Sequence, residues 1–156
     1  MVEIGQKLPS VVLVDTEMKT VNISDVANGK VAVIVFFPGA FTSVCKKELC
    51  TFKDEIVKLN STKANVIAVS VDGPFANKAF KEGNNLNFVV LSDYKRDAVS
   101  SFNVELNDFA GLTGYTVAKR SVFIADENGT IRYKWVSDDP AVEPDYAEIE
   151  SELSKL

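Results

Sequence analysis

The spacing of hydrophobic residues along the chain predicts buried strands that alternate with amphipathic helices. Lys30 to Phe37 is apolar at odd and even positions alike and is followed by Pro38, a pattern typical of a strand buried on both faces. Ser43 to Leu59 instead carries apolar residues every three or four positions among lysines and acids, and this spacing predicts a helix that ends at Asn60-Ser61. A buried strand is therefore expected to lead through a short loop into a helix.

The other segments continue the same alternation. Further strands are expected where short apolar runs end at turn residues, at Val11–Val14, Thr20–Ile23, Asn65–Val71, Phe88–Leu91, Val117–Ala125 and Thr130–Val136. Shorter helices are expected at Phe75–Glu82, Asp97–Phe102 and Pro144–Leu156, and an extended loop at Leu106–Gly114. The Asn-Gly step within Asp126–Gly129 indicates a hairpin turn. This order predicts an α/β fold with a central mixed sheet flanked by helices.

Composition and charge indicate a single globular domain and argue against several classes of protein. The chain of 156 residues is 46% hydrophobic and 25% charged, which fits one domain over residues 1–156 with a sizeable core. Its net charge of −5 argues against binding nucleic acid or an anionic membrane through a basic face. The longest apolar run, Val31 to Pro38, is too short to span a bilayer, and no basic-then-apolar leader is visible. We therefore expect a cytoplasmic protein.

The chain has no histidine and two cysteines. Two thiols alone cannot close a four-ligand zinc site, so no metal is expected, and no other cofactor is implied. Because the chain has no histidine, a cysteine or serine nucleophile cannot be paired with an imidazole base. A reactive thiolate would therefore have to be stabilised by electrostatics and hydrogen bonds alone.

The loop between the first buried strand and the following helix, Pro38 to Cys45, carries the candidate chemistry. Cys45 falls in the first turn of the predicted helix, where the helix dipole and free N–H groups favour a thiolate. It also lies beyond the carboxyl end of a strand, where ligand sites of α/β sheets occur. Thr42 places a hydroxyl one turn earlier. The alternative is that Cys45 is a small apolar side chain near a helix start.

These residues resemble the active-site signature of the peroxiredoxins, which are thiol peroxidases with a thioredoxin-like fold. The pattern Pro38-x-x-x-Thr42-x-x-Cys45 carries the resemblance, and the segment around Arg120 is similar to the strand that holds the family's active-site arginine. The cysteine pair is most similar to the Q-type branch, also called bacterioferritin comigratory proteins. Ser43 stands where the family usually has proline, so we expect altered loop rigidity rather than lost chemistry.

The resemblance implies a mechanism and a set of site residues. Cys45 would attack hydrogen peroxide or an organic hydroperoxide and become a sulfenic acid while water or an alcohol leaves. Arg120 would face both the sulfur and the peroxide, although on composition alone it could equally be a solvated strand residue. Thr42 and the N–H groups of Val44 and Cys45 would orient the peroxide, and Pro38 would shield the site from water.

The resemblance also suggests a supporting role for Glu48, which lies three residues after Cys45 and on the same side of the helix. The family often has an acid at this position that holds the arginine. An ordinary exposed helix glutamate is the alternative.

Cys50 is the only internal thiol available to reduce the sulfenic acid, and we expect it to be the resolving cysteine. Residues five apart on an α-helix have Cα atoms about 8–9 Å apart, beyond the ~7 Å reach of a disulfide, so the first turns would have to unwind. Thioredoxin or a similar dithiol would then reduce the disulfide. The alternatives are a one-cysteine peroxidase that uses an external thiol, or a peroxide sensor without sustained turnover. The protein is expected to be a monomer or a homodimer.

Overall fold

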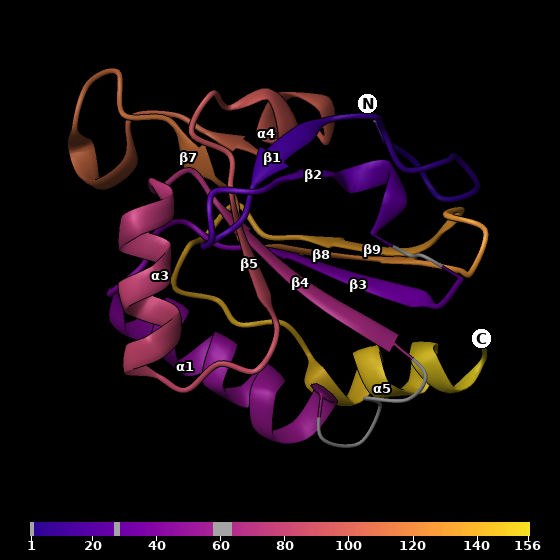
Figure 1. Cartoon of the computed structure of the whole chain (residues 1–156). Helices are drawn as coiled ribbons and strands as arrows, with labels where there is room; N and C mark the ends of the chain where they lie inside the picture. Colours follow the sequence, from indigo (N-terminus) through magenta and orange to yellow (C-terminus); the bar gives the residue numbers. More distant parts are fainter. Residues whose placement is uncertain (1, 27–28, 58–63) are drawn as a thin grey trace.

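A computed structural model describes residues 2–26, 29–57 and 64–156 and has a sheet of seven strands at its centre (Figure 1). The strands lie in the order β2-β1-β5-β4-β3-β8-β9. Strand β3 is parallel to β4, and β4 to β5, whereas β8 and β9 join the other side of β3 as antiparallel strands. This mixed sheet confirms the α/β prediction. The strands are β1 (Val12–Val14), β2 (Thr20–Asn22), β3 (Val31–Phe36), β4 (Ala64–Ser70), β5 (Val89–Ser92), β8 (Ser121–Ala125) and β9 (Ile131–Val136).

Helices cover both faces of the sheet (Figure 1). One face is covered by α1, α3 and α5, whose buried residues share a hydrophobic cluster, and the opposite face by α4. The helices are α1 (Ser43–Thr51), the π-helical η2 (Phe52–Val57), α3 (Pro74–Gly83), α4 (Asp97–Ser101) and α5 (Tyr146–Ser154), with short 3-10 turns η1 (Ile23–Asp25) and η3 (Phe109–Gly111). Within the described residues, no helix is both long and apolar enough to cross a bilayer.

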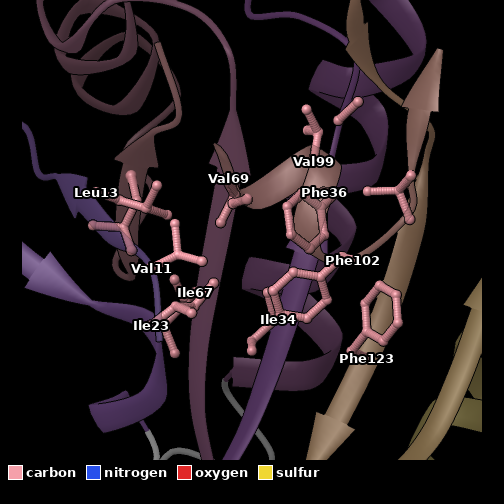
Figure 2. Packing of buried hydrophobic residues seen from close by; sticks show 14 of the residues in the cluster. Val11, Leu13, Ile23, Ile34, Phe36, Ile67, Val69, Val99, Phe102 and Phe123 are labelled. Atoms are coloured by element: carbon pink, nitrogen blue, oxygen red, sulfur yellow. The ribbon is translucent and has the colours of Figure 1, made fainter. Parts of the chain in front are cut away.

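The alternation of side chains along β3 builds the core on both faces at once. Val33 and Val35 point into the cluster under α1, and Ile34 and Phe36 into the cluster under α4. On the α4 side, the rings of Phe36, Phe102 and Phe123 pack with centroids 4.9–5.9 Å apart (Figure 2). Strand β3 is therefore held by packing on both faces of the sheet. This packing also fixes the position of the residue at which the strand ends.

One predicted strand is interrupted. Residues Val117–Ala125 were expected to form one strand, but they form β7 (Val117–Ala118) and β8, with a bend at 119–120. Strand β7 pairs with β6 (Glu105–Leu106) in a separate small sheet, whereas β8 joins the main sheet. The prediction is wrong because the strands that divide the segment between two sheets, β6 and β3, are distant from each other in sequence. The bend places Arg120 at the edge of the main sheet.

Two further expectations need correction. The predicted helix from Ser43 is α-helical only to Thr51 and continues as the wider η2, and its predicted end at Asn60-Ser61 lies outside the described residues. The predicted loop at Leu106–Gly114 contains the end of β6 and the turn η3. The Asn-Gly hairpin is confirmed: the Gly129 N–H donates to the Asp126 carbonyl at 2.9 Å.

Candidate functional site

The strand register brings the predicted loop and the predicted arginine to the same edge of the sheet. Phe36, at the end of β3, pairs with Ser121, at the start of antiparallel β8. The loop that follows β3 and the bend that precedes β8 therefore meet, and α1 begins from that loop at Ser43. Two segments 75 residues apart in sequence are joined here by a hydrogen bond between Cys45 and Arg120.

Cys45 and Arg120 are in direct contact inside the protein. Arg120 Nη2 donates to Cys45 Sγ at 3.2 Å. Cys45 is 0% exposed and Arg120 only 2% exposed, so little water screens the interaction. A guanidinium is charged at any ordinary pH, so the sulfur accepts a hydrogen bond from a group with a fixed positive charge.

The rest of the guanidinium is held by two further acceptors. Nη1 donates to Glu48 Oε1 at 2.8 Å, and Nε and Nη2 donate to the Pro140 carbonyl at 3.0 and 2.8 Å. Pro140 lies in the connection between β9 and α5, which is tied to the bend where the Ser137 N–H donates to the Arg120 carbonyl at 3.0 Å. The planar guanidinium group of Arg120 is thus held by three acceptors, and these acceptors set its orientation toward the sulfur.

Glu48 is buried and contacts the arginine, so it is not an exposed helix residue. It is 0% exposed, and its Oε2 atom has no hydrogen-bond partner. Burial raises the pKa of Glu48 to about 8, although the charge of Arg120 acts in the opposite direction. Burial therefore disfavours the charged form of the carboxyl group, while its contact with Arg120 favours that form. In either form, Glu48 Oε1 accepts a hydrogen bond that orients Arg120.

The loop before α1 is held in a conformation that is unusual for a non-glycine residue. Phe41 has a φ of +66°, in the left-handed region. The loop is anchored where the Ala40 N–H donates to Asp72 Oδ2 at 2.7 Å, just beyond the end of β4. The Thr42 hydroxyl donates to the Gly39 carbonyl at 3.0 Å, so it braces the loop rather than capping α1 or contacting the sulfur.

Backbone donors accompany the thiol at the start of α1. The first hydrogen bond of the helix runs from the Lys46 N–H to the Thr42 carbonyl at 2.9 Å. The N–H groups of Val44 and Cys45 precede it and have no carbonyl one turn earlier to bind. These donors and the positive end of the helix dipole lie beside the sulfur.

A pocket of about 220 Å³ opens beside these groups. It is lined by side chains from four parts of the chain, namely Pro38, Thr42, Ser43, Val44, Phe109, Arg120, Pro140 and Ala141. Pro38 is buried and forms one wall. A small molecule in this pocket would meet Arg120 and the start of α1 directly.

Cys50 faces a different part of the protein from Cys45. Its Sγ lies 3.9 Å from Asn84 Oδ1, at the end of α3, and the residue is partly buried. Both cysteines are free thiols. Because both belong to the regular helix α1, the two sulfurs point to different neighbours, and the structure does not bring them together.

Three contributors to the site were not identified from the sequence. Asp72 directly follows the predicted strand Asn65–Val71, and an acid beyond a parallel strand next to the reactive loop could have indicated a role. Pro140 acts through its backbone carbonyl. Every residue type has this group, so the sequence gives no sign of the role. Phe109 lies in the segment predicted to be a loop, Leu106–Gly114, and its place in the pocket depends on tertiary structure.

The described residues contain no group of three or more cysteine, aspartate or glutamate side chains arranged to hold a metal ion. The groups that the site itself presents are the Cys45 thiol, the Arg120 guanidinium, the Glu48 carboxyl group and the backbone donors of α1. That set fits a reaction in which a sulfur nucleophile meets an acceptor that develops negative charge.

Known proteins are similar to this chain in sequence and in fold. The model of the AhpC/TSA family matches residues 4–134. Peroxiredoxin Bcp of Bacillus subtilis is 34% identical over 135 residues, covering 86% of this chain and 85% of the relative. A putative peroxiredoxin Bcp of Coxiella burnetii is 31% identical over 134 residues, covering 86% of this chain and 88% of the relative.

Among solved structures, a peroxiredoxin-like protein of Aquifex aeolicus superposes with a TM-score of 0.85 at 28% sequence identity, covering 99% of this chain and 87% of that one. The fold is thus the thioredoxin-like α/β fold. The chain belongs to the AhpC/TSA family and is a peroxiredoxin of the Q-type, or Bcp, branch, an enzyme of the thiol peroxidase class.

Proposed function

We propose that Cys45 is the nucleophile of the peroxidase reaction. The observation that carries this proposal is the contact of its sulfur with buried Arg120 at 3.2 Å, at the start of a helix. The thiolate attacks one peroxide oxygen, an S–O bond forms and the O–O bond breaks. The sulfur is oxidised by two electrons to a sulfenic acid, and the departing oxygen takes a proton to leave as water or an alcohol.

Each group around Cys45 has its own role in stabilising the transition state or in shaping the pocket around it. The Arg120 guanidinium and the N–H groups of Val44 and Cys45 stabilise negative charge on the two peroxide oxygens as the O–O bond breaks. Thr42 contributes by bracing the loop through its bond to Gly39. Pro38 keeps bulk water away from one side of the pocket.

Glu48 acts through Arg120 as a positioning residue. Its contact with Arg120 Nη1 fixes the guanidinium group so that Nη2 reaches the sulfur of Cys45. Since burial raises the pKa of Glu48, its carboxyl group cancels less of the arginine's positive charge than a fully ionised one would.

We further propose that Cys50 resolves the sulfenic acid by forming a disulfide with Cys45 and releasing water. The separation of the two cysteines on a regular helix requires α1 to unwind first. This is feasible because α1 has only nine residues and its regular hydrogen bonding changes at Phe52. Thioredoxin or a similar cytoplasmic dithiol then reduces the disulfide, and the chain needs no second copy for this cycle.

The nucleophile is tested by replacing Cys45 with serine. Cys45→Ser is expected to lower peroxide consumption in the presence of excess dithiol by at least about a thousandfold, because serine is not ionised and is a far weaker nucleophile. Sustained turnover by the unmodified protein distinguishes an enzyme from a stoichiometric sensor. Retention of peroxide consumption by Cys45→Ser would contradict the assignment.

The resolving role is tested by mass spectrometry of the protein after one equivalent of peroxide. The unmodified monomer is expected to lose two hydrogens as the disulfide forms, whereas Cys50→Ser is expected to gain oxygen on Cys45. Cys50→Ser should still consume the first equivalent of peroxide at the same rate. An unmodified monomer that gains oxygen without losing two hydrogens would show a one-cysteine enzyme.

The protonation of Glu48 predicts how stability depends on pH. A pKa raised from 4.5 to about 8 means that the folded state binds one proton more tightly, so the free energy of unfolding falls as pH rises through this window. The slope from one proton is at most about 1.4 kcal/mol per pH unit. We expect Glu48→Gln to remove this slope when denaturant unfolding is measured between about pH 5 and pH 8.

Both proteins in this comparison carry Cys45→Ser, so that titration of the thiol does not contribute. Glu55→Gln, which changes an exposed glutamate of the adjoining η2, is the matched control and should behave as its parent does. Parallel stability curves for Glu48→Gln and its parent would show that Glu48 is ionised in the folded protein.

A further inference from the structure

Helix α1 is attached to the C-terminal part of the chain at a point between its two cysteines. Lys47 Nζ lies 3.0 Å from Glu143 Oε2, and the Tyr146 hydroxyl donates to Glu143 Oε1 at 2.7 Å. We infer that these three residues, the α1 clamp, hold α1 in its helical form and so limit the rate at which Cys50 reaches the sulfenic acid of Cys45. This inference rests on the proposed resolving step and concerns what controls it.

Contacts on either side of the α1 clamp hold the rest of the helix. At the start of α1, the Pro140 carbonyl accepts hydrogen bonds from Arg120, which donates to Cys45. At its end, the start of α5 lies beside it, and the Tyr146 ring packs edge-on against Phe52 with centroids 5.5 Å apart (Figure 1). The stretch that must unwind is therefore held at its start, its middle and its end by the connection before α5 and the first residue of α5.

The backbone presents Glu143 in a fixed position. Pro144 follows it directly and is buried, and a residue before proline is restricted to extended conformations. Asp145 then caps α5, since its side chain accepts a hydrogen bond from the Glu148 N–H at 3.1 Å. An unwinding α1 must therefore pull Lys47 away from a carboxylate that stays in place.

The α1 clamp carries a negative charge that its donors stabilise. Burial alone would raise the pKa of Glu143, but the hydrogen bonds from Tyr146 and Lys47 outweigh it and lower the pKa. Burial and the bond to Glu143 raise the pKa of Tyr146, so its hydroxyl keeps its proton and donates. The same hydroxyl interacts with the side chain of Thr51, the last residue of α1. Tyr146 thus joins the carboxylate to the end of the helix.

The resolving step needs the unwound form of α1, in which these contacts are absent. The Cys50 sulfur attacks the sulfenic sulfur of Cys45, the S–S bond forms and the S–O bond breaks, and the hydroxyl group leaves as water with the thiol proton. The sulfenic sulfur is reduced and the thiol sulfur is oxidised to the same level. Contacts made only in the helical form lower the population of the unwound form. Removing one should speed this step and leave the attack on peroxide, which uses the helical form, unchanged.

The test follows both steps by quenched-flow mass spectrometry after the reduced protein is mixed with excess hydrogen peroxide. Gain of one oxygen reports the sulfenic acid, and loss of two hydrogens reports the disulfide. We expect Glu143→Ala and Tyr146→Phe each to raise the rate constant of disulfide formation about threefold. Lys47→Met should raise it about twofold, because the Lys47 side chain is 72% exposed and water weakens its ion pair. The rate constant of Cys45 oxidation should change less than about twofold.

Glu152→Ala and Tyr94→Phe are the matched controls. Glu152 pairs with Lys155 at 3.0 Å at the far end of α5, so its replacement removes an ion pair of the same kind. Tyr94→Phe removes the hydroxyl of an exposed tyrosine. Neither control should change either rate constant. Because Lys47 acts through the Glu143 carboxylate, Lys47→Met should add nothing in the Glu143→Ala background.

The sign of the change separates a clamp from a contact that only supports the fold. Slower oxidation and slower disulfide formation in both Glu143→Ala and Tyr146→Phe would mean that these residues only support the site. An unchanged rate of disulfide formation in both would mean that they do not restrain α1. Either result overturns the clamp and leaves the peroxidase and its resolving cysteine intact. Absence of a disulfide in the unmodified protein would instead overturn the proposed resolving step, and the clamp with it.

Discussion

The burial of one positive charge organises this protein. Arg120 is almost fully removed from water, and an unpaired guanidinium in that position would cost several kcal/mol. Its acceptors are Cys45 and Glu48 of α1 and the carbonyl of Pro140 in the connection before α5. Two parts of the chain, α1 and the connection before α5, are therefore held to the bend at Arg120 because each supplies acceptors to the same side chain.

The same interaction links stability to the proposed chemistry. In the proposed reaction, the thiolate form of Cys45 and the Arg120 guanidinium stabilise each other, and the positive end of the α1 dipole stabilises the thiolate as well. Oxidation to a sulfenic acid removes that negative charge, so one of the contacts that hold the start of α1 in place is weakened. In our account, this loss favours the unwinding that brings Cys45 to Cys50. The contact between Arg120 and Cys45 would thus affect both the peroxidatic step and the resolving step.

The sequence predicted the elements whose pattern is local and missed those that depend on distant partners. Strand β3 and the start of α1 follow from apolar spacing and a proline, and Arg120 was identified through a family resemblance. The bend that orients Arg120 was missed because it depends on hydrogen bonds to the distant Val104 and Ser137. Pro140 could not be foreseen because a backbone carbonyl acts as an acceptor whatever the residue type.

The central proposal is that the Arg120 guanidinium makes the sulfur of Cys45 reactive, and it is tested most directly by the rate of Cys45 alkylation by iodoacetamide at neutral pH in a Cys50→Ser background. The account predicts that Arg120→Met, which keeps apolar bulk but removes the charge, slows alkylation about tenfold or more, since the thiolate is the reacting form. Arg120→Lys, which keeps a charge without the fork, should lie between. Equal alkylation rates in the three folded proteins would contradict the account.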